Sequence, residues 1–198
     1  MDDHRRALNV LRAYLLERAS FTNAELDFVD TMFVYRRLAA REFLQRAGAV
    51  AQYSAFVTRG CLRSYVIDAD GHEHVVKFAA ETWWVADTNS LSNRTPSQYF
   101  IDALEDSELL LLDAASHERL VNEVPGYAAG FRRGIQRHSA AKDTRIVSNL
   151  SASAQERYSE FLATYPSIAM RVPQRMLASY LGISPETLSR IRAKRAKK

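Results

Sequence analysis

The hydrophobic positions near the start of the chain recur at the spacing of amphipathic helices. Between Asp3 and Arg18 the leucines lie three or four residues apart, which predicts a first helix. Thr22 is followed three residues later by Glu25, the pattern of a capping box, which predicts that a second short helix begins there. We therefore expect two helices ahead of any strand.

The pattern changes between about residues 32 and 113. Short stretches rich in Val, Ile, Phe, Tyr and Leu replace the helical spacing, and they are interrupted at Gly48, Gly60 and Gly71. Breaks spaced by eleven or twelve residues are typical of short antiparallel strands in a sandwich or barrel. The pattern predicts a β-roll, or jelly roll, in the middle of the chain.

The clearest strand pair flanks Asp68-Ala69-Asp70-Gly71. Residues 61–67 and 73–78 lie on either side of this turn, and both are rich in β-branched and aromatic residues. Glycine supplies the positive φ angle that a hairpin turn needs. We expect a β-hairpin here.

A long helix is predicted after the roll. Helical spacing returns at Ser116 and, after the break at Pro125, apolar residues recur over residues 126–149. Such a helix measures about 36 Å, more than a small roll can cover, so its exposed stripe is expected to pair with the same helix of a second subunit. Because His138 and Lys142 interrupt the stripe, a helix packed only on its own roll is the alternative.

The end of the chain has the pattern of a helix-turn-helix. Residues 174–181 are amphipathic, Gly182 permits a tight turn, and Ser184 followed by Pro185 is a favourable start for a second helix. Leu188 falls on the face of that helix expected to be buried. Two short helices joined in this way suit a DNA-binding motif, although a purely structural helical hairpin has the same pattern.

The charge of the chain is unevenly distributed. The formal net charge at pH 7 is +4, yet the residues from Ser151 onward include nine basic and three acidic side chains, against 18 and 20 before it. A basic unit on a slightly acidic body indicates a polyanionic partner for that unit. A solvated basic tail is the alternative that charge alone leaves open.

Composition and cysteine content favour a cytoplasmic globular protein. The chain is 47% hydrophobic and 25% charged, begins with polar residues and has no long apolar run, so we expect neither a signal peptide nor a membrane span. Cys61 is the only cysteine, and one thiol cannot form an internal disulfide or hold a metal by itself. We expect a buried Cys61 and no cofactor.

The stretch Leu181-Gly-Ile-Ser-Pro-Glu-Thr-Leu-Ser-Arg190 resembles the recognition segment of the Crp/Fnr family of transcription regulators. The resemblance covers nearly all of the chain and implies an α+β fold with N-terminal helices, an antiparallel β-roll, a long dimerisation helix and a C-terminal helix-turn-helix. The implied domains are a sensor like a cyclic nucleotide-binding domain (1–125), the dimerisation helix (126–150) and a DNA-binding domain (151–198). The implied partners are a second subunit, a palindromic operator in double-stranded DNA, RNA polymerase and an unidentified small-molecule effector.

Glu186, Ser189 and Arg190 match the Glu-x-x-Ser-Arg part of the family's pattern. The resemblance implies that Glu186 and Arg190 read base edges, which suits a carboxylate that accepts from cytosine and a guanidinium that donates to guanine. Their presence also disfavours a pure interaction module. Pro185 stands where some members have another base-reading arginine, so no operator sequence is implied. DNA phosphates are expected to contact Gln174, Arg175, Ser184, Thr187, Ser189, Arg192 and Lys194.

The sensor half resembles the family more loosely, through Arg59-Gly-Cys-Leu-Arg63, Asp70-Gly-His-Glu73, Glu81-Thr-Trp-Trp-Val-Ala-Asp87 and Ala103-Leu-Glu-Asp106. In members that bind a cyclic nucleotide, a short helix offers backbone amides, a glutamate and an arginine to the ribose phosphate. Here Ser97 stands near the position of that arginine, and Arg94 is out of register. We therefore expect no response to cyclic AMP. The candidate effector pocket comprises Trp84, Asp87, Arg94 and Ser97.

His72 and His74 raise the alternative of a metal-dependent enzyme. A His-x-His pair on a strand is half of the metal site of a cupin, a barrel of similar topology in which a carboxylate follows closely. The next acidic residue after His74 is Glu81, which is too distant for that pattern. We therefore expect no enzyme activity and no metal site, and haem binding by Cys61 or His72 has no supporting motif.

Overall fold

The structure is a computed structural model that describes residues 2–196, and it divides into two units. The first unit comprises residues 1–64 and 79–136, and the second comprises residues 65–78 and 137–198. Both the predicted hairpin and the long helix therefore run from one unit into the other. The last two lysines of the basic C-terminal end lie outside the described residues.

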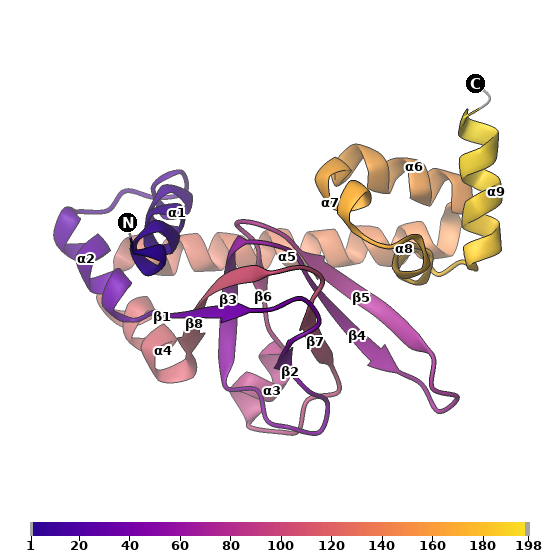
Figure 1. The fold of residues 1–198 in the computed structure, drawn as a ribbon. Coiled ribbons are helices and arrows are strands. Elements are labelled where there is room, and N and C mark those ends of the chain that lie inside the picture. Colours follow the sequence, from indigo (N-terminus) through magenta and orange to yellow (C-terminus); the bar gives the residue numbers. More distant parts are fainter. Residues whose placement is uncertain (1, 197–198) are drawn as a thin grey trace. The chain divides into compact units, whose positions relative to one another are not determined.

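The described helices and strands follow the order expected from the sequence (Figure 1). In chain order they are α1 (Asp3–Leu16), α2 (Asn23–Thr31), β1 (Val34–Leu38), β2 (Phe43–Gln45), β3 (Tyr53–Arg59), β4 (Leu62–Ile67), β5 (Glu73–Ala79), β6 (Trp84–Val85), α3 (Thr88–Asn93), β7 (Phe100–Ala103), β8 (Ser107–Asp113), α4 (Ala114–Glu123), α5 (Pro125–Ser151), α6 (Ala154–Thr164), α7 (Pro166–Arg171), α8 (Gln174–Leu181) and α9 (Pro185–Ala196). The α+β class is confirmed. The short α3 and the pair α6 and α7 were not predicted.

The predicted capping box starts α2. The N–H of Glu25 donates to Oγ1 of Thr22 at 3.2 Å, and the N–H of Thr22 donates to Oε2 of Glu25 at 2.7 Å. Two backbone N–H groups that would otherwise lack partners are satisfied in this way. The first helix is also present, and it ends at Leu16 rather than at the predicted Arg18.

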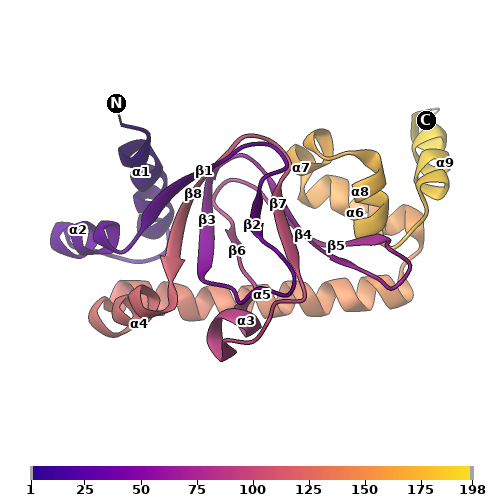
Figure 2. The same cartoon turned by 60° about the horizontal axis from the view of Figure 1, so that its bottom comes forward.

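The strands form two four-stranded sheets, which confirms the predicted β-roll. The order in one sheet is β1-β8-β3-β6, and the order in the other is β2-β7-β4-β5. In the first sheet β3 and β8 are antiparallel, with Ala55 opposite Leu111 and Phe56 opposite Leu110. Figure 2 shows α1, α2 and α4 gathered beside β1 and β8.

Strand β8 is buried on both faces. Leu109 and Leu111 belong to the core between the two sheets, whereas Leu110 and Leu112 belong to the core that α1, α2 and α4 share with the same sheet. Successive side chains of a strand point to opposite faces, so a strand covered on both sides needs an uninterrupted apolar run. The four consecutive leucines of β8 meet that need.

A buried ion pair links β4 and β7 inside the first unit. The guanidinium of Arg63 donates to both carboxylate oxygens of Asp102, from Nε at 2.8 Å and from Nη2 at 3.0 Å. Each of the two residues is only 6% exposed. Both charges are removed from water, so the pairing helps to compensate each of them.

Gly60 allows the turn between β3 and β4 to pass close to β8. Its φ angle is +99°, and a Cβ atom at this position would lie 2.7 Å from the Cα of Ser107. Its N–H donates to Oε1 of Glu81 at 2.8 Å. A glycine is therefore required by the backbone angle and by the close approach together.

Helix α5 is 27 residues long and exposes large apolar side chains. The length agrees with the long helix expected from the sequence. Its exposed apolar residues are Phe131, Ile135, Ile146, Val147 and Leu150. Among the described residues, no helix is both long enough and apolar enough to cross a membrane.

Candidate nucleic-acid interface

The turn between α8 and α9 has the predicted helix-turn-helix geometry. Helix α8 is followed by Gly182, which has a φ angle of +65° and donates to the carbonyl of Ser179 at 3.1 Å. The hydroxyl of Ser184 accepts from the N–H of Thr187 at 3.2 Å, and Pro185 is the first residue of α9. The glycine ends one helix and the Ser-Pro pair starts the next, so the turn is fixed by local chemistry.

One face of α9 is buried against its neighbours. Leu188 is 1% exposed, Leu177 and Ala178 of α8 and Phe161 of α6 are buried, and α6, α8 and α9 contact one another. Burying a leucine side chain contributes roughly 1.5–3 kcal/mol. This packing fixes which face of α9 is turned outward.

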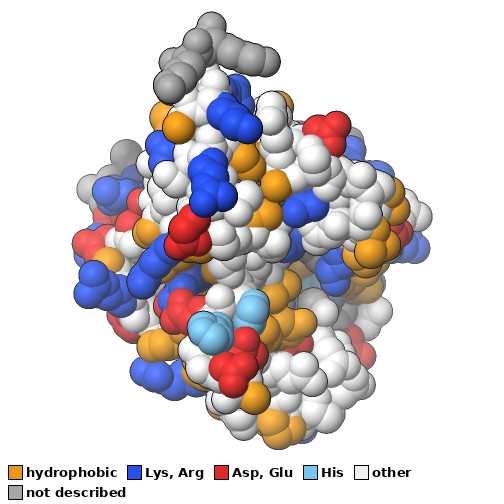
Figure 3. Space-filling view, turned by 90° about the vertical axis from the view of Figure 1, so that its right-hand side faces the viewer, with side chains coloured by type: hydrophobic (Ala, Val, Ile, Leu, Met, Phe, Trp, Pro, Cys, Tyr) orange, Lys and Arg blue, Asp and Glu red, His pale blue; other side chains and the backbone are white. Residues whose placement is uncertain are grey.

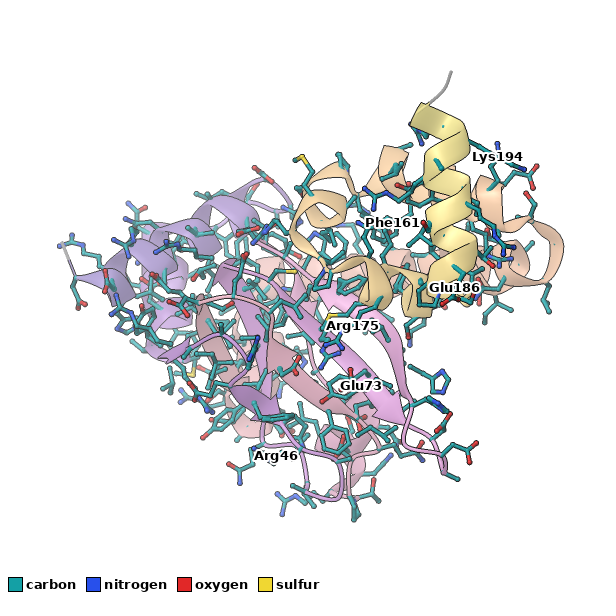
Figure 4. The ribbon with its side chains drawn as sticks, turned by 45° about the vertical axis from the view of Figure 1, so that its right-hand side comes forward. Arg46, Glu73, Phe161, Arg175, Glu186 and Lys194 are labelled. Carbon is teal, nitrogen blue, oxygen red and sulfur yellow. The ribbon has the colours of Figure 1, made fainter. Side chains whose placement is uncertain are left out.

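The outward face of α9 presents the residues expected to contact DNA. Glu186, Ser189, Arg190, Arg192 and Lys194 are exposed, and Thr187 is half-buried. Figure 3 shows basic side chains following α9, with an acidic group among them. Glu186 lies in the first turn and Lys194 further along the same helix (Figure 4).

Glu186 is held in its ionised form at neutral pH. Its own backbone N–H, the Ser184 hydroxyl and the charge of Arg190 all lower the pKa of the Glu186 carboxyl below its usual value. An ionised carboxylate is repelled by phosphate but accepts a hydrogen bond from an amino group on a base. The charge state of Glu186 therefore suits contact with a base edge.

The start of α8 adds two further candidate residues. Gln174 and Arg175 are both exposed in the first turn of this helix. Gln174 also lines a hollow of about 490 Å³ together with Pro185, Ser189 and Arg192 of α9. The structure thus brings Gln174 beside two of the residues predicted to bind phosphate.

The hairpin segment of the second unit is bonded directly to α8. The hydroxyl of Ser179 accepts from the N–H of Val75 at 2.9 Å and donates to the carbonyl of Glu73 at 3.0 Å. The Ser179 side chain on α8 thereby forms two hydrogen bonds with the backbone of strand β5. No sequence pattern had identified Ser179.

Arg145 of α5 reinforces the same junction. Its guanidinium donates to the carbonyl of Tyr180 at 2.9 Å, lies 3.9 Å from the centre of the Tyr180 ring and also donates to the carbonyl of Val76. The rings of Phe78 and Tyr180 are 5.3 Å apart. Strand β5, α5 and α8 are therefore joined by polar and aromatic contacts within one unit.

The four residues of the predicted effector pocket lie in different surroundings in the first unit. Trp84 packs against Phe56 in the core, and Asp87 caps α3 by accepting from two backbone N–H groups. Arg94 is exposed with a φ angle of +53°, and Ser97 is buried with its hydroxyl accepting from the N–H of Tyr99. Of the four, only Asp87 lines the hollow of about 300 Å³ beside β2 and β3.

His72 immediately precedes β5, and His74 is the second residue of that strand. Asp68, at the start of the turn, accepts from the N–H groups of Asp70 and His72 and lies 2.6 Å from Nε2 of His74. These contacts with His74 and the backbone lower the pKa of Asp68 to about 2. Cys61 is buried, as expected.

A comparison with known domain families finds a match in the middle of the chain. Residues 35–124 match the cyclic nucleotide-binding domain. The matched segment runs from the second residue of β1 past the end of α4 and therefore includes nearly all of the β-roll. No curated protein sequence matches the chain at a significant level.

Solved structures share the fold over most of the chain. FixK2 from Bradyrhizobium japonicum has 20% identity and a TM-score of 0.69, covering 82% of this chain and 83% of that one. The c-di-GMP-responsive global regulator CLP from Xanthomonas campestris has 14% identity and a TM-score of 0.71, covering 89% and 92%. A protein from Eubacterium rectale described as a Crp/Fnr-family regulator has 16% identity and a TM-score of 0.65, covering 89% and 85%.

Proposed function

We propose that this chain, which has the fold of Crp/Fnr regulators, is a homodimeric transcription regulator that binds a palindromic DNA operator in the cytoplasm. The observation that carries the proposal is the orientation of α9. Leu188 lies on the buried face of α9, whereas Glu186 and Arg190 are exposed one turn apart on its outer face. Residues four apart on a helix point the same way, so both can enter one groove. No catalytic activity forms part of this proposal.

Base reading is assigned to Glu186 and Arg190. Arginine can donate two hydrogen bonds to the major-groove edge of guanine, and a carboxylate can accept from the amino group of cytosine. The second helix of a helix-turn-helix lies in the major groove with its N-terminal residues on the base edges, and Glu186 and Arg190 lie in the N-terminal half of α9. The remaining predicted DNA contacts, which include Gln174 and Lys194, are assigned to the phosphates.

Dimerisation is assigned to α5. A helix of 27 residues is about 40 Å long, and its exposed apolar side chains extend from Phe131 to Leu150. A two-fold dimer would present two copies of α9 to half-sites about 34 Å apart. Selection of bound DNA from a random pool tests this arrangement, because a dimer selects inverted repeats whereas a monomer selects single half-sites.

RNA polymerase and a small-molecule effector are the further partners that we propose.

Changing Arg190 or Lys194 to alanine is expected to weaken DNA binding in different ways. Loss of a guanidinium that reads guanine costs about 1–3 kcal/mol of discrimination at one position of each half-site. Loss of a lysine that contacts phosphate weakens all sequences alike and reduces the salt slope by about one per site. Affinities for the selected operator and for single-base variants, at two salt concentrations, separate the two effects.

Both variants leave the core of the second unit intact, because Arg190 and Lys194 are exposed. Equal, sequence-independent losses in the two variants would refute the base-reading role of Arg190. Unchanged affinity in both would refute DNA recognition by α9. Arg5→Ala, on the exposed surface of α1, serves as the control for loss of a positive charge outside the proposed interface.

Cyclic AMP is expected neither to stabilise the protein nor to change its affinity for DNA. The buried Ser97 stands where a phosphate-binding arginine is expected, and Arg94 is exposed at the end of α3. A ligand at 100 times its dissociation constant adds about 2.7 kcal/mol to the free energy of unfolding, so binding would be visible as a higher melting temperature. A clear rise with cyclic AMP would mean that Arg94 supplies the phosphate contact after all.

A further inference from the structure

The turn of the β4–β5 hairpin gathers four side chains that can bind a metal. One carboxylate oxygen from each of Asp68 and Asp70 and one ring nitrogen of His72 lie within 4.8 Å of one another. Nε2 of His74 lies 2.6 Å from Oδ2 of Asp68. Figure 3 shows histidine and acidic side chains side by side on this face. All four residues belong to the hairpin segment of the second unit.

The backbone of the turn positions the carboxylate of Asp68. Its Oδ1 accepts from the N–H of Asp70 at 3.0 Å and from the N–H of His72 at 2.9 Å. These two bonds fix the plane of the carboxylate and direct Oδ2 toward His74. A ligand held by backbone hydrogen bonds loses less freedom when an ion binds, as in metal sites whose ligands are oriented by their neighbours.

Small side-chain rotations would bring the four groups around one ion. Ligands of a tetrahedral ion with bonds of about 2.0–2.2 Å are separated by roughly 3.5 Å. The side chains of His72 and His74 are 74% and 55% exposed, so their rings can turn without disturbing a core. Such rotations must shorten the present separations of up to 4.8 Å among Asp68, Asp70 and His72.

We propose that the hairpin tip binds one divalent transition-metal ion of the zinc class through His72, His74, Asp68 and Asp70. Imidazole nitrogen is a preferred ligand of zinc, nickel and cobalt, whereas magnesium and calcium take oxygen ligands almost exclusively. The mixed set of two imidazoles and two carboxylates therefore selects the transition metals. All four ligands come from seven consecutive residues, so the site forms wherever the hairpin forms.

The position of the site connects it to α8. His74 stands between Glu73 and Val75, whose backbone groups are the two partners of the Ser179 hydroxyl. An ion held at the tip restrains the start of β5 and, through these two bonds, the first helix of the helix-turn-helix. We expect metal binding to change the affinity for DNA. This second step, the effect of the bound metal on DNA affinity, rests on the proposed function, whereas the metal site does not.

The site is tested by titrating the full chain with zinc chloride in a calorimeter. The protein carries no histidine tag and is first stripped of metal with a chelator. We expect one zinc ion per chain, and at least a tenfold loss of affinity in the double variant His72→Gln, His74→Gln. Asp68→Asn is also expected to weaken binding, because its amide oxygen can still accept the backbone N–H groups but the carboxylate is lost. A millimolar excess of magnesium is expected not to displace zinc.

Glu73→Gln is the matched control. It removes one carboxylate from the same hairpin, and because successive side chains of a strand alternate, that of Glu73 lies on the face opposite its neighbour His74. Circular dichroism verifies that each variant folds, and the single variant His72→Gln replaces the double variant if the latter is unfolded. Absence of saturable binding, one zinc per two chains, or equal affinity in the histidine variant and the wild type would overturn the site.

DNA affinity measured with and without zinc tests the second step separately. A change in the wild type that is absent from the histidine variant supports the connection through Ser179. Zinc binding with unchanged DNA affinity would overturn the connection and leave the site. Zinc binding by a chain that selects no DNA would overturn the proposed function and leave the site.

Discussion

Replacing Asp102 with alanine is expected to destabilise the first unit by about 3–5 kcal/mol. The substitution leaves the guanidinium of Arg63, which is 6% exposed, without the carboxylate that accepts two of its hydrogen bonds. Removing one partner of a buried ion pair costs this much because a charge that stays away from water loses a carboxylate that compensates it. Trp83 and Trp84 are the only tryptophans of the chain and both lie in the first unit, so urea unfolding followed by tryptophan fluorescence reports the loss.

The double variant Arg63→Met, Asp102→Leu separates charge burial from packing. Because both charges are removed, its stability is expected to exceed that of Asp102→Ala. Asp27→Ala is the matched control, since Asp27 also pairs with an arginine but its side chain is 71% exposed. An exposed pair contributes about 0–1 kcal/mol. A loss in Asp102→Ala no larger than in Asp27→Ala would contradict the assigned role of the buried pair.

Gly60→Ala is expected to cost about 2–5 kcal/mol of stability in the same unit. A positive φ angle costs a residue with a side chain about 1–2 kcal/mol, and overpacking adds about 1–3 kcal/mol. The new Cβ would lie 2.2 Å from Oγ and 2.7 Å from Cα of Ser107. The hydroxyl can rotate away, but the backbone atom cannot move without shifting β8. Urea unfolding followed by tryptophan fluorescence measures the change.

Gly48→Ala isolates the contribution of the backbone angle. Gly48 has a φ angle of +86° in the same unit, yet no atom lies within 4 Å of a Cβ built there. Its substitution should therefore show only the backbone cost of about 1–2 kcal/mol. Equal losses at the two glycines would mean that the close approach to Ser107 contributes nothing.

The elements that the sequence predicted well are those with local signals. Two helix starts are specified by side chains within three residues of the start, at Thr22 and at Ser184. The hairpin is specified by its turn, and its flanking strands begin and end within one residue of the predicted positions. Such signals act over a few residues, so they can be read without knowledge of the fold.

Two unpredicted helices also carry local signals. Ser153 and Glu156 form a complete capping box at the start of α6, and Pro166 is the first residue of α7. A capping box also located α2, and a proline at the first helical position also helped to locate α9. The two signals lie between the predicted long helix and the predicted helix-turn-helix, and neither was interpreted as a helix start. Helix α3 is different, because it has only six residues and one turn cannot show a hydrophobic period.

The contacts of Ser179 depend on the fold and not on local sequence. This serine is 104 residues from Val75 along the chain, and no periodicity connects the two positions. The metal-binding candidates at the hairpin were missed for another reason. A cupin-like pattern required a carboxylate after His74, whereas the structure places Asp68 and Asp70 beside the histidines from the preceding turn.

The second unit is assembled from two separate stretches of chain, and this limits how such a protein can be rearranged by recombination. A fragment that begins at residue 137 lacks Phe78 and the strand partners of Ser179. A gene fusion that transfers only the C-terminal stretch would leave the rings of Phe161 and Tyr180 without the ring of Phe78. A functional exchange between relatives must therefore carry residues 65–78 with it, so the hairpin and the helices α6, α8 and α9 are expected to be inherited together.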